Sequence, residues 1–128
     1  MAFSTHEGEQ LIDDHAGMAR YFDVYSFSDE GVKFVDRREN SKYAGDERMK
    51  HGDPKKAKKS LSALGGVDVW ANPRFGPNLP RLLKKLLCVV VRVETIEEAV
   101  ELITDNLDTV VEEHANGEER KHLVLTPR

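Results

Sequence analysis

An almost unbroken apolar run, Cys88-Val89-Val90-Val91-Arg92-Val93, is the feature of this sequence that most constrains the fold. A strand this apolar is typical of the interior of a sheet whose two faces are both covered by helices. Amphipathic patterns on either side predict those helices, at about residues 79–87 and from Ile96 to about residue 115. The run therefore predicts an α/β protein with parallel strands.

The other strands and helices follow from local signals. An aromatic and β-branched segment, Tyr21 to Phe27, is followed by Asp29-Glu30-Gly31, which predicts a β-hairpin with its second arm at Val32 to Arg37. Thr95 and Glu98 form a capping box at the start of the last helix. The remaining expected elements are strands at residues 1–5 and 67–71 and a helix from Asp53 to Leu64.

The expected order is strand, hairpin, helix, strand, helix, strand, helix. Right-handed crossovers then place three parallel strands side by side, with the hairpin antiparallel to its neighbour. We expect a mixed sheet of five strands in the order 3-2-1-4-5 with helices on both faces. This arrangement is similar to the ribonuclease H-like fold. The domain is expected to end near residue 117, and residues 118–128 form a tail in which Leu123-Val124-Leu125 either adds an edge strand, docks on a partner or stays mobile.

Composition narrows the functional classes. The chain has 128 residues, enough for one domain with a sizeable core, and its net charge of −4 argues against general nucleic-acid binding. Its single cysteine, Cys88, excludes an internal disulfide, so we expect a reducing cytoplasm. No apolar run is long enough to span a bilayer, and the N-terminus lacks a signal-peptide pattern.

The stretch Ile12 to Arg20 is hard to explain by packing alone. It places Asp13, Asp14, His15 and Gly17 between two expected strands, where acids and glycine predict a loop. A neutral imidazole can ligate a metal, and a glycine beside it leaves room for a bulky ligand. The alternative is an ordinary polar turn.

The carboxyl ends of parallel strands are where ligands bind in open α/β sheets. The turn 72–78 is at such an end and carries Arg74, a cationic fork, and Gly76, which permits close approach to the backbone. His51 precedes the expected helix, whose Lys55 and Lys56 add positive charge. Together with His15 these residues predict a shallow pocket for an anionic ligand. The alternative for Arg74 and for the lysines is a solvated surface.

Several catalytic classes lack their residues. Two-metal phosphoryl chemistry needs converging carboxylates, and the first strand carries none. No G-x-S-x-G, phosphate-binding loop or dinucleotide-binding glycine motif is present, and Cys88 begins a buried strand. One cysteine and no His-x-x-x-His pair cannot make a structural zinc site. We therefore expect none of these catalytic classes.

Residues 13–22, Asp-Asp-His-Ala-Gly-Met-Ala-Arg-Tyr-Phe, resemble the D-x-H-F-G-x-A-x-x-F segment of the NifX and NifB C-terminal type, the dinitrogenase iron–molybdenum cofactor family. The later elements His51-Gly52, Gly66-Val67-Asp68-Val69, Gly76-Pro77 and Thr95-Ile96-Glu97-Glu98-Ala99 resemble that family in matching order. The resemblance covers about residues 1–115. One departure is Ala16, where the family usually has a phenylalanine that would wall the pocket.

The resemblance implies a domain that is not an enzyme and that binds or carries an iron–sulfur or iron–molybdenum–sulfur cluster, or its precursor, during nitrogenase cofactor assembly. The family histidine corresponds to His15, which becomes the expected cluster ligand. Gly17, Arg74 and Gly76 would support the anionic cluster, and His51 is a second candidate contact. Partners would be proteins that donate or accept the cluster. The alternative is a protein-interaction domain that has kept the fold and lost the ligand, binding through residues 38–52 or the tail.

Overall fold

The computed structural model describes residues 1–40 and 61–127. A six-stranded sheet in the order β3-β2-β1-β4-β5-β6 runs through it. The predicted order of the first five strands is confirmed, and a sixth strand extends the sheet beyond β5. The strands are β1 (Ala2–Thr5), β2 (Tyr21–Ser28), β3 (Gly31–Glu39), β4 (Val69–Asn72), β5 (Leu87–Val91) and β6 (Leu123–Leu125).

The parallel and antiparallel directions of the strands are as expected. β1 pairs in parallel with β4, β4 with β5, and β5 with β6, while β2 and β3 are antiparallel to their neighbours. β3 is longer than expected: it ends at Glu39 and not at Arg37, so Arg38 and Glu39 also belong to the hairpin. A register shift between Val24 and Tyr25 marks a bulge in this hairpin.

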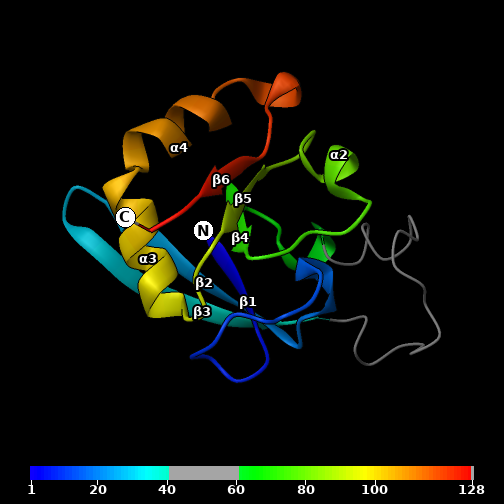
Figure 1. The fold of residues 1–128 in the computed structure, drawn as a ribbon, viewed down its shortest axis with the longest axis vertical. Helices are drawn as coiled ribbons and strands as arrows, with labels where there is room; N and C mark the ends of the chain where they lie inside the picture. Colours follow the sequence, from blue (N-terminus) through cyan, green and yellow to red (C-terminus); the bar gives the residue numbers. More distant parts are fainter. Residues whose placement is uncertain (41–60, 128) are drawn as a thin grey trace.

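Helices cover both faces of the sheet, as predicted (Figure 1). α3 (Ile96–Asp105) and α4 (Leu107–His114) pack on one face, where Phe3, Leu87, Val89 and Ile103 are buried. The short α2 (Leu79–Leu82) and the helical turn at 61–63 lie on the other face with Trp70, Phe22 and Leu86. Apolar side chains thus fill two core layers, one on each side of the strands.

Two helix predictions need correction. The helix expected at 79–87 ends at Leu82, and turns follow it. The leucines expected on its inner side nevertheless pack against the sheet. The helix expected from Ile96 to about residue 115 is broken at Asn106. Nδ2 of Asn106 donates to the Leu102 carbonyl at 2.8 Å, and φ of −122° at this residue takes the backbone out of the helical region. The capping box of Thr95 and Glu98 is present as predicted.

The apolar run Leu123-Val124-Leu125 in the tail forms β6 and adds an edge strand to the sheet, which is one of the three alternatives given above. Its residues pair with Val89, Val90 and Val91, and Leu125 is buried against the α3 side of the core. Among the described residues, no helix is long and apolar enough to cross a membrane.

Candidate functional site

The loop after β1 and the turn after β4 meet at one edge of the sheet. The two strands are parallel neighbours, so their carboxyl ends lie side by side. The backbone N–H of Ala16 donates to the Arg74 carbonyl at 2.9 Å, and Nδ2 of Asn72 donates to the Asp14 carbonyl at 2.9 Å. We call this contact region the rim.

His15 and Gly76 are in direct contact at the rim. A Cβ on Gly76 would lie 2.9 Å from Nδ1 of His15, closer than real Cβ atoms approach, and 3.3 Å from its Cγ, which is tighter than most real contacts. Gly76 does not have a positive φ. Glycine is therefore favoured here by space and not by backbone conformation. The Nδ1 atom is buried, while the residue as a whole is half-buried.

Arg74 and Asp13 form an exposed ion pair across the rim. Nη1 of Arg74 lies 3.7 Å from Oδ1 of Asp13, with side-chain exposures of 61% and 100%. An exposed pair of this kind contributes about 0–1 kcal/mol. The Arg74 guanidinium is thus mostly in solvent, as in the alternative of a solvated surface. Nothing in the sequence indicated that Asp13 would lie beside it.

Buried side chains hold the rim from below. Nε1 of Trp70 donates to Oγ of Ser4 at 2.8 Å, and Oγ of Ser4 donates to the Ala16 carbonyl at 2.8 Å. On the far side of the loop, Nδ2 of Asn40 donates to the carbonyls of Gly17 and Ala19 at 3.0 and 2.8 Å. These bonds come from three strands or strand ends, so the loop is attached to the sheet as a unit.

Packing explains more of the stretch 12–20 than the sequence indicated. Ile12, Ala16 and Ala19 are at most 3% exposed and belong to the core layer on the α2 side. The Ala16 side chain consequently faces the core beside Phe22 and Trp70, and is not an open wall of a ligand pocket. The acids and the imidazole of this stretch, in contrast, stay at the surface or half-buried.

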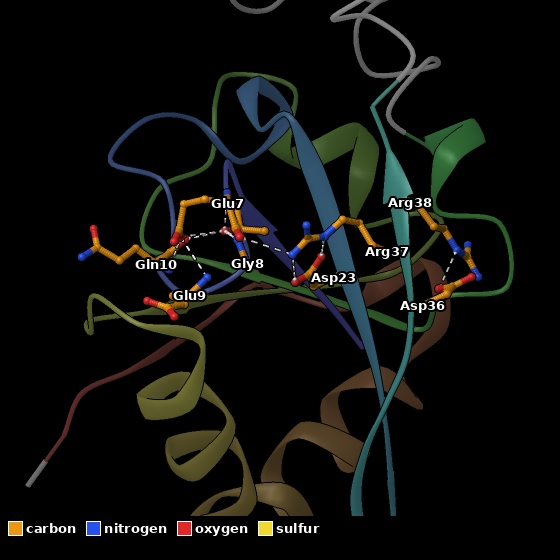
Figure 2. A network of polar contacts seen from close by, with 9 residues as sticks. Glu7, Gly8, Glu9, Gln10, Asp23, Asp36, Arg37 and Arg38 are labelled. Atoms are coloured by element: carbon orange, nitrogen blue, oxygen red, sulfur yellow. Dashed lines mark hydrogen bonds and ion pairs between the residues drawn. The ribbon is translucent and has the colours of Figure 1, made fainter.

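The first half of the loop after β1 is fixed by a separate polar network (Figure 2). The Glu7 carboxylate accepts the backbone N–H groups of Glu9 and Gln10, which lower its pKa. Arg37 bonds to the Glu7 carbonyl at 3.4 Å and to both carboxylate oxygens of the buried Asp23 at 2.9 and 3.3 Å. A side chain at Gly8, where φ is 104°, would collide with the Arg37 guanidinium. This network shapes the loop on the α3 side of the sheet.

Of the predicted site residues, the structure brings His15, Gly17, Arg74 and Gly76 to the rim. His51, Gly52, Lys55 and Lys56 lie outside the described residues. Within residues 1–40 and 61–127, no three His, Cys, Asp or Glu side chains gather in a way that could hold a metal ion.

Sequence reasoning missed the asparagines that organise the rim. Asn72 and Asn40 are both fully buried, which is uncommon for a polar side chain. A signal was available for Asn72, because an asparagine at the end of an apolar strand is a poor strand former and a good turn former. No comparable signal marked Asn40 at the end of a charged strand.

The fold and the rim together define a class: a mixed α/β domain in which two loops at the carboxyl ends of parallel strands present an imidazole, a guanidinium and a glycine. The model of the dinitrogenase iron-molybdenum cofactor family matches residues 1–106. The chain belongs to this family, and the resemblance drawn from its motifs is confirmed. No curated protein and no solved structure matches the chain.

Proposed function

We propose that this protein binds and carries an anionic iron–sulfur or iron–molybdenum–sulfur cluster, or a precursor of one, without catalysing a reaction. Family membership supports a connection with the iron–molybdenum cofactor. The single observation that carries the proposal is the contact between the His15 loop and the turn from Arg74 to Gly76 at the carboxyl ends of β1 and β4.

In this proposal His15 ligates a metal of the cluster. We assign the bond to Nε2, because Nδ1 is buried against Gly76. Arg74 supplies positive charge to the anionic cargo, and it exchanges the weak contact with Asp13 for the ligand. Gly76 makes room for the imidazole, and Gly17 adds no side chain near it. His51 is retained as a second candidate contact. A donor or an acceptor protein would be the partner of such a carrier.

The test is anaerobic reconstitution with iron, sulfide and molybdate, followed by elemental analysis of the protein. We expect the His15→Ala variant to take up much less metal than the natural protein. His122→Ala is the matched control, since His122 is exposed and lies just before β6, away from the rim. Equal uptake by the His15→Ala variant would exclude His15 as the ligand, and no uptake by the natural protein would exclude the carrier role.

The second candidate function is protein interaction without a cluster. It is favoured by Val124, which is 49% exposed on the edge strand β6 in the tail. Because β6 is part of the sheet, deleting the tail would disturb the fold, so Val124→Lys is the sharper variant. A carrier should load the cluster normally with this substitution, whereas an interaction domain should bind its partner less well and contain no metal.

A further inference from the structure

Asn72 is the last residue of β4 and its side chain joins both loops of the rim. The residue is fully buried. Its Nδ2 donates to the carbonyl of Asp14, in the loop after β1, and to the carbonyl of Arg74, in the turn after β4, each at 2.9 Å. A carboxamide has two N–H donors, so each loop receives one.

The other end of the same carboxamide is different. Its Oδ1 is buried and has no hydrogen-bond partner among the described residues. Exchanging the oxygen and nitrogen would turn the oxygen toward two carbonyls, so the neighbouring acceptors determine the orientation. An apolar side chain of similar shape would avoid the unsatisfied acceptor. The advantage of an asparagine over an apolar side chain here is therefore the two hydrogen bonds that its Nδ2 donates.

These two bonds hold the backbone next to the residues of the proposed site. Asp14 immediately precedes His15, and the Arg74 carbonyl also accepts the N–H of Ala16. The imidazole of His15 in turn rests on Gly76, two residues beyond Arg74. Any change in the separation of the two loops must shift the imidazole relative to the turn.

We propose that Asn72 is the positioning residue of the rim: its carboxamide sets the separation of the His15 loop from the Arg74 turn, and through it the affinity for an anionic metal–sulfur ligand. The affinity part rests on the proposed function. Asn72 is too deeply buried to touch a ligand and acts through His15 and Arg74.

The experiment compares Asn72→Asp and Asn72→Leu with a matched control, Asn106→Asp. Nδ2 of Asn106 also donates to a backbone carbonyl, that of Leu102, but at the junction of α3 and α4. Circular dichroism verifies that each variant is folded. Amide hydrogen exchange of Ala16 by NMR measures the contact between the loops without any ligand, and titration with tetrathiomolybdate at pH 8 measures anion affinity.

We expect both Asn72 variants to lose protection of the Ala16 amide and to bind tetrathiomolybdate about tenfold more weakly, the loss that corresponds to roughly one hydrogen bond. Asn106→Asp should match the natural protein in both measurements. Burial and two facing carbonyls raise the pKa of the carboxyl introduced at position 72, and protonation gives it one donor. Ala16 protection in Asn72→Asp should therefore recover as the pH falls, whereas in Asn72→Leu it should not.

The two readouts separate this inference from the proposed function. If the natural protein does not bind tetrathiomolybdate, the carrier role loses its support, and Ala16 protection still decides whether Asn72 positions the loops. Unchanged Ala16 protection in both Asn72 variants overturns the inference. Lost protection with undiminished affinity overturns it as well, because the loop separation would then not set the affinity.

Discussion

Gly76→Ala tests the packing at the centre of the rim. The new Cβ would lie 2.9 Å from Nδ1 of His15, and a relaxed contact of about 3.5 Å requires the ring to move by roughly 0.6 Å. Overpacking costs about 1–3 kcal/mol, and we take about 1 kcal/mol because the half-buried ring can shift toward solvent. The smaller entropy of the unfolded alanine chain offsets about 0.4–1 kcal/mol.

The expected net loss of stability is therefore small, about 0–0.6 kcal/mol, or at most roughly 2 °C in Tm for a chain of this size. The informative quantity is the dependence on His15. In a His15→Ala background the Cβ meets no ring atoms, so Gly76→Ala should stabilise the protein by about 0.4–1 kcal/mol. The two substitutions should thus be coupled by about 1 kcal/mol in urea unfolding followed by circular dichroism.

Gly65→Ala is the control for the double-mutant cycle. A Cβ at Gly65 has only the Ser62 carbonyl oxygen nearby, at 3.8 Å, and the residue does not have a positive φ. Its substitution should have the same effect with and without His15. If Gly76→Ala costs as much in the His15→Ala background as in the natural protein, the contact between ring and glycine does not explain the preference for glycine.

Three further predictions concern the fold around the site. Thr95→Ala removes the capping box of α3 and should cost about 1 kcal/mol in urea unfolding, whereas Ser62→Ala, at an exposed position, should have little effect. Arg37→Ala leaves the buried Asp23 carboxylate without its cation. The loss of stability should be about 1–3 kcal/mol, less than for a fully buried pair because the Arg37 side chain is 41% exposed. Adding Asp23→Asn should recover part of that loss. The N–H groups of Gln10 and Glu9 hold the pKa of Glu7 below its ordinary 4.5, so the stability it contributes is present above pH 4.5 and disappears as the pH falls through the lowered pKa. Glu7→Gln should therefore lose less stability between pH 5 and pH 3 than the natural protein, and equal losses would contradict this assignment.

Local chemistry made the hairpin and the capping box predictable. Gly31, at φ 116°, lies at the turn that the sequence marked, and the Thr95 and Glu98 side chains satisfy the first backbone N–H groups of α3 within one turn of helix. Strand order followed from the alternation of strands and helices, since crossovers have one preferred hand. Such features depend on neighbouring residues or on chain order, and both can be read from a sequence.

Two kinds of feature were not predictable: a break inside a continuing apolar pattern, and contacts between residues far apart in the chain. Asn106 breaks a helix whose apolar spacing continues through it, so the periodicity alone did not reveal the break. Ser4 and Trp70 are 66 residues apart, and neither residue indicates a shared hydrogen bond in the linear sequence. His15 was expected near Arg74 because both follow parallel strands whose carboxyl ends lie together. The contact of its ring with Gly76, in contrast, depends on side-chain packing that the sequence does not show.

The rim combines a fixed base with an adaptable outer edge. Its backbone is held by buried side chains, Ser4 from β1 and Asn72 from β4, so the carbonyls and amides around His15 have little freedom. Its charge, in contrast, is carried by Arg74, which is mostly exposed and pairs with a fully exposed Asp13. A guanidinium in this position can follow anions of different shapes at little energetic cost, because the pair that it leaves is weak. The metal bond of the proposed site would therefore be specified by the fixed imidazole, and the selection for negative charge by a side chain that adjusts to its cargo.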